Sequence, residues 1–329
     1  MSTVYGPVPS WRFGRSLGVD VVTPPKKCTF DCVYCQLGKT KIHISTPEML
    51  KEPLVSLDKV MRDFDDVLGR VDFRTVDIVT FSGCGEPTLN LGLNKIAEQV
   101  KAKIGAKPMA ILTNSSLFYR EDVRRNLSKF DFVVAKLDVG NDEVLRLVNR
   151  PADTELNMQT ITDSIEKLKK EIKGILALEV MLLQSDDRRI SNVEGENLKD
   201  LIDAVIEIEP DIVQLEVPYR PPSEIYIKEP SQEKLRQVSS EFSKILGEER
   251  VWVYGIHDRR GRIVTWLRHE SIEKEVLDLL RRRPCRAIDV SVSLGIDLPT
   301  TQSILKDLRN RDQIETRVVS GEEFCFRKS

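Results

Sequence analysis

The sequence of 329 residues predicts an α/β protein with a parallel sheet, followed by a smaller domain. Up to about residue 265, short apolar runs alternate with amphipathic helical patterns, which is typical of parallel strands joined by helices. The chemically distinctive segments follow the ends of these runs, where a barrel carries its working loops. Beyond residue 265 the order changes to three helices and a hairpin. We therefore expect one domain over residues 1–265 and a second over 266–329.

The expected strands and helices of the large domain follow from hydrophobic periodicity. Strands are expected at 17–22, 76–81, 109–112, 132–137, 175–183, 212–217 and 251–254. Helices are expected at 60–68, 93–104, 121–127, 160–173 and 198–208, and from a cap at Ser231 to about Leu246. This alternation alone is compatible with either a barrel or a doubly wound sheet.

The small domain has the element order of a winged helix-turn-helix. Helices are expected at 271–282, 287–294 and 299–310, and strands at 313–319 and 323–327. On this interpretation the third helix is the recognition helix, with Gln302, Lys306 and Arg309 facing outward. A local basic run (Arg281, Arg282, Arg283 and Arg286) favours phosphate, but nearby acidic residues balance it. RNA binding, peptide or protein binding, and structural packing all remain open.

Composition indicates an ordinary soluble protein. Charged residues make up 31% and hydrophobic residues 40%, and the formal net charge of −2 provides no general attraction to nucleic acid or membrane. The N-terminus has no basic region followed by an apolar run, and no stretch approaches the ~18 apolar residues of a membrane span. We expect a cytoplasmic protein without a membrane partner, because clustered cysteines in such a chain fit a reducing compartment.

Three of the six cysteines lie within eight residues. Cys28, Cys32 and Cys35 form a C-x3-C-x2-C run, and thiolates this close together can converge on one soft metal centre. Three protein ligands leave one coordination position of the metal centre open, and a catalytic metal centre requires such an open position. The alternatives are a zinc site with His43 as fourth ligand and a purely structural role. An iron–sulfur cluster with one free iron is the favoured interpretation.

With the aromatic Tyr34 before its last cysteine, this run resembles the cluster motif of the radical S-adenosylmethionine (SAM) superfamily. More narrowly, segments 6–20, 81–88, 136–151 and 213–224 resemble the wyosine-synthase-like group. The resemblance implies a partial (β/α)6 barrel similar to a TIM barrel, a [4Fe–4S] cluster on Cys28, Cys32 and Cys35, and SAM as cofactor. It also implies an electron donor, and reductive cleavage of SAM to a 5′-deoxyadenosyl radical that abstracts hydrogen.

Residues 83–87 provide the second motif. Gly83 and Gly85 allow close approach of the backbone to a ligand, and Glu86 offers an acceptor for an ammonium group. The resemblance implies that this turn, which ends in Pro87, holds the amino group of SAM. Cys84 replaces the first glycine of the family's GGEP motif, and it is either a radical or methyl relay or a small packed side chain.

Further SAM contacts are implied by the resemblance, with Tyr34 near the adenine and Asn114 near the ribose. Strand alternation places Lys136 and Asp138 on one side of their strand. Lys136 could bind the SAM carboxylate or form an imine with a carbonyl substrate, and the alternative is a buried Lys136–Asp138 ion pair. Asp138 is counted with the cofactor-binding residues.

The substrate is predicted only by analogy with the subgroup, which favours RNA and a tRNA base. Wyosine-base synthase carries extra cysteines ahead of its motif, whereas this chain has none before Cys28. The alternatives are peptide or protein modification, and a non-catalytic iron–sulfur or zinc regulator that binds DNA.

Overall fold

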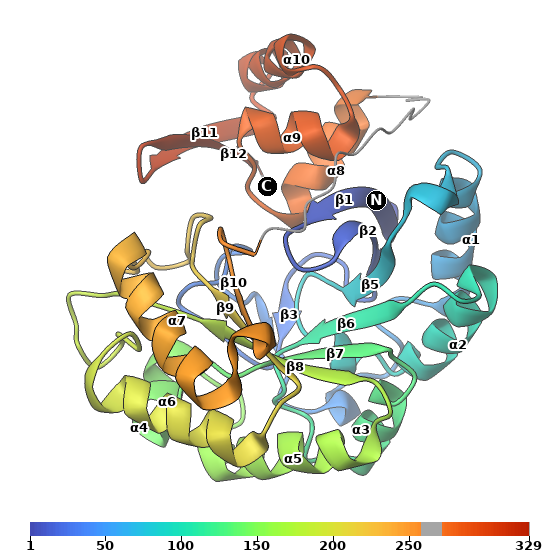
Figure 1. Ribbon diagram of the computed structural model, residues 1–329. Helices are drawn as coiled ribbons and strands as arrows, with labels where there is room; N and C mark the ends of the chain where they lie inside the picture. The colour runs from blue at the N-terminus through green and yellow to red at the C-terminus, as the bar shows by residue number, and fades with distance from the viewer. Residues whose placement is uncertain (258–271, 329) are drawn as a thin grey trace.

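The computed structural model describes residues 1–257 and 272–328, and an eight-stranded sheet runs through it (Figure 1). The strands lie in the order β1-β2-β5-β6-β7-β8-β9-β10, and all neighbours from β2 to β10 are parallel. Their bounds are β1 Val4–Ser10, β2 Gly14–Asp20, β5 Ile78–Ser82, β6 Met109–Thr113, β7 Phe132–Lys136, β8 Ile175–Met181, β9 Ile212–Glu216 and β10 Val251–Val253.

The seven predicted strands are confirmed, with ends that differ by a few residues, but β1 was not predicted. This strand pairs antiparallel with β2 and forms one edge of the sheet. Its sequence contains Gly6, Pro7 and Pro9, which indicate a loop when only the sequence is considered. Prolines are tolerated at a sheet edge, and the register of β1 shifts between Tyr5 and Val8.

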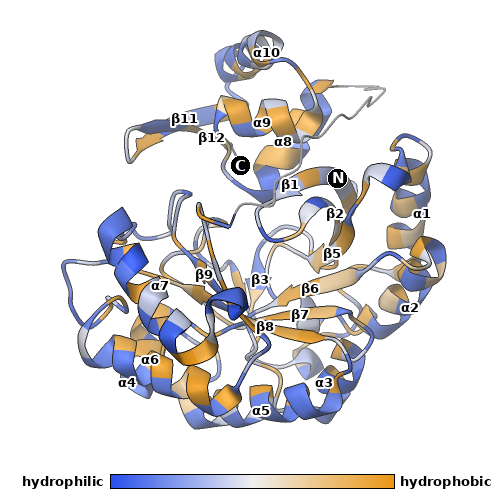
Figure 2. Cartoon of the chain, viewed as in Figure 1, coloured by the Kyte–Doolittle hydropathy of each residue, from blue (hydrophilic) through white to orange (hydrophobic). Residues whose placement is uncertain are grey.

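Helices cover the outer side of the curved sheet, so the large domain is a partial barrel rather than a doubly wound sheet (Figure 1). Their bounds are α1 Leu57–Leu68, α2 Leu93–Ile104, α3 Glu121–Leu127, α4 Asp142–Val148, α5 Met158–Glu171, α6 Gly195–Ile208 and α7 Gln232–Leu246. Apolar residues gather on the strands and on the helix faces turned toward them (Figure 2). Ser231 caps α7 as predicted, whereas α4 was not predicted.

Short elements occupy several loops between the main strands and helices. β3 (Lys27–Cys28) and β4 (Ile42–His43) pair with each other within the cysteine segment. The 3₁₀ helices are η1 Pro47–Met49, η2 Phe73–Thr75, η3 Pro87–Leu89 and η4 Glu248–Arg250.

The C-terminal module, residues 272–328, has the predicted order of three helices and a hairpin. Its elements are α8 Ile272–Arg282, α9 Ala287–Leu294, α10 Leu298–Asn310, β11 Ile314–Val319 and β12 Glu322–Arg327. Its buried apolar side chains, which include Val276, Val290 and Leu308, form a group separate from the barrel core. The predicted boundary at 265/266 and residue 271 lie outside the described residues, and the domain division stays a prediction.

A buried ion pair joins the C-terminal module to the barrel. Nε of Arg282, the last residue of α8, lies 2.8 Å from Oδ2 of Asp20 at the end of β2, and both side chains are less than 10% exposed. The same guanidinium donates to the carbonyl of Ser2 and lies 4.2 Å from the ring centre of Tyr5. The N-terminal strands and α8 are therefore held together.

Within the described residues, none of the helices combines the length and apolarity required to cross a membrane.

Candidate active site

The cysteine segment follows β2 and is fixed against the 83–87 turn by backbone hydrogen bonds. Lys27 N donates to the Cys84 carbonyl at 3.0 Å, and Glu86 N donates to the Lys27 carbonyl at 3.1 Å. Gly85 lies between these bonds with φ +144°, and a Cβ there would come within 1.5 Å of the Lys27 carbonyl oxygen. Only glycine permits this approach.

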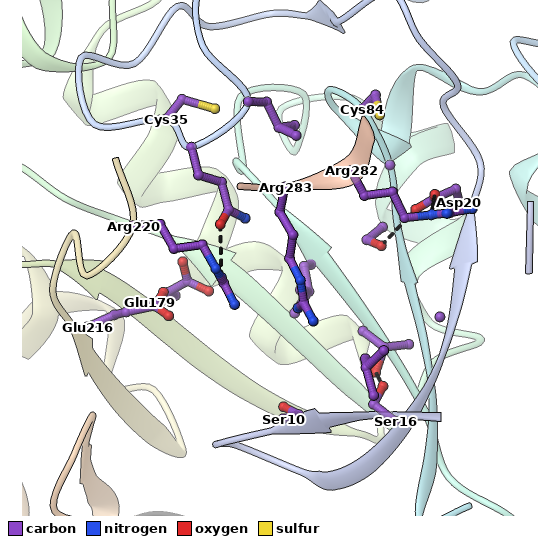
Figure 3. A pocket seen from close by; sticks show the side chains of 18 of the residues that line it. Ser10, Ser16, Asp20, Cys35, Cys84, Glu179, Glu216, Arg220, Arg282 and Arg283 are labelled. Carbon is purple, nitrogen blue, oxygen red and sulfur yellow. Dashed lines mark hydrogen bonds and ion pairs between the residues drawn. The ribbon is translucent and has the colours of Figure 1, made fainter. Parts of the chain in front are cut away.

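The three predicted ligands line one cavity of about 630 Å³ together with Cys84. Figure 3 shows Cys35 and Cys84 in this cavity. Cys28 and Cys32 are buried, Cys35 is half-buried, and all are free thiols. Burial raises the pKa of Cys28, and it raises the pKa of Cys32 to about 11. Within 1–257 and 272–328, no three His, Cys, Asp or Glu side chains are arranged to hold a single metal ion.

Lys26 lies beside these thiols. Its Nζ donates to the Gly38 carbonyl at 2.7 Å. Burial lowers the pKa of Lys26, but the negative charge that Cys35, Cys28 and Cys32 carry as thiolates outweighs this and raises it overall. The loop therefore fits an anionic thiolate-ligated group, with open cavity beside the three sulfurs.

Glu86 is buried and joins the 83–87 turn to the end of β6. Its Oε1 accepts from Thr88 and, at 2.6 Å, from the Thr113 hydroxyl, while Oε2 accepts from Asn114 N at 2.7 Å. Burial raises the pKa of Glu86, and these hydrogen bonds lower it, with a net rise. Oε2 has a single protein donor and can accept a further hydrogen bond.

Other residues of the predicted SAM site lie around Glu86. Gly83, Gly85 and Asn114 line the cavity, and Asn114 Nδ2 donates to the Thr29 hydroxyl at 2.7 Å and to Cys28 Sγ at 3.5 Å. Pro87 is buried at the start of η3 and supports the turn.

Asp138 is placed differently from the expectation of a cofactor contact. It is 3% exposed and lies behind the cavity wall, where it accepts hydrogen bonds from the Tyr34 hydroxyl, Asn149 Nδ2 and Met181 N. Tyr34 itself lines the cavity. Asn149 Nδ2 also lies 3.6 Å from Cys32 Sγ. Asp138 therefore orients Tyr34 and the cysteine loop from behind, which sequence periodicity could not distinguish from a position in the lumen.

Lys136 lines the cavity but is ion-paired. Its Nζ lies 2.6 Å from Glu179 Oε1 and 3.6 Å from Asp138 Oδ1. Burial lowers the pKa of Lys136, but the charges of Asp138 and Glu179 outweigh it and hold the pKa above its ordinary value. The sequence alternative of an ion pair is therefore present, with Glu179 as the nearer partner.

Two carboxylates that were not predicted extend this network. Arg12 Nη2 lies 2.6 Å from both Glu179 Oε2 and Glu216 Oε2, and Trp11 Nε1 donates to Glu216 at 3.1 Å. Each glutamate is an isolated charge in an apolar strand, β8 or β9, and that pattern could have identified them. Arg12 is therefore neutralised by two carboxylates of the protein.

We expect Lys136 to resist trapping as an imine. Its raised pKa keeps the amine protonated, and each pKa unit lowers the reactive neutral fraction tenfold. Glyoxylate with cyanoborohydride at pH 7 should therefore label Lys136 at least about tenfold less than the exposed Lys41, measured by peptide mass spectrometry. Equal labelling would show that the ion pair does not restrain the amine.

Cys84 is 4% exposed and lines the cavity. Burial raises the pKa of its thiol to about 12, so the sulfur is protonated at neutral pH. Its backbone N donates to the Val22 carbonyl at 2.7 Å. The side chain is therefore packed and also faces the reaction volume.

The loop after β9 is also hydrogen-bonded to the cysteine segment. The Ser223 hydroxyl donates to the Cys32 carbonyl at 2.9 Å, and Glu224 N donates to the Val33 carbonyl at 3.0 Å. Arg220, in the same loop, donates to Gln36 at 2.8 Å.

Comparison with known proteins identifies the family. The model of the radical SAM superfamily matches residues 22–193, which hold the three cysteines, the 83–87 turn, Asn114 and Lys136. The chain belongs to the radical SAM superfamily. It is a radical SAM enzyme, and its family implies SAM and an iron–sulfur cluster as cofactors. The non-catalytic alternative is therefore set aside.

Relatives of this radical SAM enzyme match between two thirds of its length and nearly all of it. A UPF0026 protein of Methanocaldococcus jannaschii is 30% identical over 320 residues, covering 97% of this chain and 90% of the relative. A UPF0026 protein of Synechocystis is 35% identical over 218 residues, covering 66% and 76%.

Solved structures similar to this radical SAM enzyme include TYW1 with a lysine–pyruvate adduct, at 16% identity and TM-score 0.48, covering 70% of this chain and 73% of that one. Coproporphyrinogen III oxidase (HemN) from Escherichia coli has 13% identity and TM-score 0.47, covering 97% and 86%. The family assignment rests on the superfamily model and not on these structures.

Proposed function

We propose that this radical SAM enzyme carries a [4Fe–4S] cluster on Cys28, Cys32 and Cys35 and abstracts hydrogen from an RNA substrate, a tRNA base. The observation that carries the proposal is that three thiols of one loop line the same cavity as Glu86, Asn114 and arginines of the C-terminal module. With SAM and an external electron donor, the bound cluster supplies the 5′-deoxyadenosyl radical. The sequence resemblance to the wyosine-synthase-like group favours a tRNA base.

In this proposal the protein's own residues bind and orient SAM. The 83–87 turn presents backbone groups, and Glu86 Oε2 accepts a hydrogen bond from the SAM ammonium. Asn114 and Tyr34 bind the ribose and adenine, while Lys136, whose charge is neutralised by Glu179 and Asp138, donates a hydrogen bond to the SAM carboxylate. Cys84 is a neutral thiol in the same cavity, able to donate a hydrogen atom.

The C-terminal module is proposed to be a winged helix. The order α8-α9-α10-β11-β12 supports this assignment, because a winged helix has three helices followed by a hairpin. On α10, the polar side chains of Gln302, Lys306 and Arg309 are exposed and available to RNA.

Replacing Cys32 with alanine tests the chemistry. After anaerobic reconstitution with iron and sulfide, the native enzyme should form 5′-deoxyadenosine from SAM and dithionite. Cys32→Ala should lower this rate at least about 1,000-fold, since removing a residue of a catalytic unit costs this much or more. Cys325→Ala, which removes a buried thiol of the C-terminal module, is the control for general thiol loss. Deoxyadenosine from Cys32→Ala at the native rate would contradict the ligand assignment.

Binding of unfractionated tRNA tests the substrate class. Phosphate contacts make the logarithm of the association constant fall linearly with the logarithm of salt concentration. A steep slope supports RNA, whereas absence of tRNA binding by an enzyme that cleaves SAM favours peptide or protein modification.

A further inference from the structure

Among the residues that the structure describes, two arginines of the cavity make no ion pair with an acid, and we propose that these two, Arg220 and Arg283, together bind a phosphate group of the substrate. Both line the cavity that holds the three cysteines, and both extend into it in Figure 3. This inference rests on the proposed function and adds to it the chemical class of the substrate.

The other arginines of the cavity and Lys136 are neutralised by carboxylates. The pairs are Arg12 with Glu179 and Glu216, Lys136 with Glu179 and Asp138, Arg282 with Asp20, and Arg286 with Asp289 and Glu322. Lys26 faces the three thiols. Arg220 and Arg283 are therefore the two arginines of the cavity wall that make no ion pair with a carboxylate in the described part of the chain.

Arg283 lies between α8 and α9, and its Nη2 donates to the Ser293 hydroxyl at 3.2 Å. Its Nε is buried without a hydrogen bond in the described part of the chain. Cys285, Tyr219 and Tyr5 are close enough to act on its pKa. Burial raises the pKa of all three, that of Tyr5 to about 12, so they are neutral and cannot balance the guanidinium.

Arg220 comes from the loop after β9 and has a neutral partner, Gln36 Oε1. Its guanidinium lies 4.4 Å from the ring centre of Tyr219, and its Nε is likewise buried without a hydrogen bond among the described residues. Asp289, an acid whose pKa Arg220 influences, is engaged by Arg286 through two side-chain hydrogen bonds of 3.0 Å. Both Arg220 and Arg283 are close enough to Tyr219 to act on its pKa, which places the two charges near one ring.

A phosphate fits this pair better than a carboxylate does. One guanidinium fork occupies both oxygens of a carboxylate, whereas a phosphate has further acceptor oxygens for a second fork. A phosphate monoester also carries a charge near −2 at neutral pH, which matches two guanidinium groups. Because Gln36 follows Cys35, the phosphate would lie beside the cysteine loop, and the C-terminal module completes its site through Arg283.

The test uses the reconstituted, SAM-saturated enzyme with inorganic phosphate as probe, followed by ³¹P NMR. Arg220→Gln and Arg283→Gln should each raise the Kd for phosphate at least about tenfold, because each removes charge-assisted hydrogen bonds. Arg281→Gln is the matched control, since Arg281 adjoins the pair in sequence but is exposed and bound to Asp278. It should leave the Kd unchanged. Iron content and thermal unfolding show whether each variant is folded.

Each outcome supports or overturns the inference. Unchanged phosphate affinity in both variants, or no phosphate binding by the native enzyme, overturns it. A weaker Kd for SAM with unaltered phosphate affinity assigns the pair to the SAM carboxylate instead, and this also overturns it. Displacement of phosphate by tRNA supports a phosphodiester as its source, whereas lack of displacement supports a small phosphorylated substrate. Arginine-dependent phosphate binding without deoxyadenosine formation by the native enzyme would refute the proposed function alone.

Discussion

Replacing Gly85 with alanine is expected to lower 5′-deoxyadenosine formation at least about 100-fold, the scale of a 1 Å misplacement of reacting groups. The added Cβ would lie 1.5 Å from the Lys27 carbonyl oxygen, a backbone atom that cannot turn aside. To avoid this clash, residues 27–28 must move away from the 83–87 turn. This movement breaks the hydrogen bonds of Lys27 with Cys84 and Glu86. Cys28 then moves out of position, and bound iron per chain should fall with the rate.

The control for Gly85→Ala is Gly105→Ala. Gly105 also has a positive φ, +61°, but a Cβ there meets no atom within 4 Å. This change adds backbone strain of about 1–3 kcal/mol without a steric clash, and it should keep full iron content. Comparing the iron content of the two variants distinguishes the effect of backbone strain at a positive φ from the effect of the steric clash with Lys27. Full iron content in Gly85→Ala would mean that the cysteine loop does not depend on this contact.

Replacing Arg282 with methionine is expected to lower the free energy of unfolding by about 3–5 kcal/mol at pH 8, because it leaves Asp20 buried without its counter-charge. Urea denaturation followed by circular dichroism measures this loss. The double variant with Asp20→Asn should recover more than about 2 kcal/mol, since removing both charges of a buried pair costs far less than removing one. Arg15→Met, which breaks the half-exposed pair with Asp77, should cost below about 1 kcal/mol.

The loss in Arg282→Met should grow with pH. Burial raises the pKa of Asp20, and Arg282 counteracts that rise. Without Arg282 the folded-state pKa moves further above the unfolded value near 4, so the folded protein binds the proton more tightly. Stability is then lost as pH rises through this interval, and the difference from the native enzyme should be smallest near pH 4 and largest by pH 8. A loss of equal size at both pH values would contradict a charged Asp20.

Helices could be predicted where apolar residues recur on one face. The helices α2, α3 and α9 begin and end at the predicted residues. The strand β1 could not be predicted, because its glycine and prolines interrupt the periodicity that marks a buried face. The helix α4 was not predicted, although α3 has the same length of seven residues and was.

In the candidate site, contacts between sequence neighbours could be predicted, whereas contacts between residues far apart in sequence could not. Cys28, Cys32 and Cys35 are neighbours in sequence, so their common cavity follows from local spacing. The partners of Arg12 and Arg282 lie 167 and 262 residues away, and no local pattern reports them. The basic residues of 281–286 could be recognised in the sequence, but the number of charges does not indicate where each side chain points. Arg282 and Arg283 face the barrel cavity rather than an outer surface.

The pairing of Asp20 with Arg282 also sets an order of events during synthesis. The cysteine loop is complete soon after residue 35, whereas the module that lines its cavity requires residues beyond 282. At about 5–20 residues per second, the loop is open to its surroundings for roughly 10 to 50 s of translation. During this interval iron and sulfide donors can reach the thiols without displacing α8 and α9, so delivery of the cluster to the nascent chain is unobstructed.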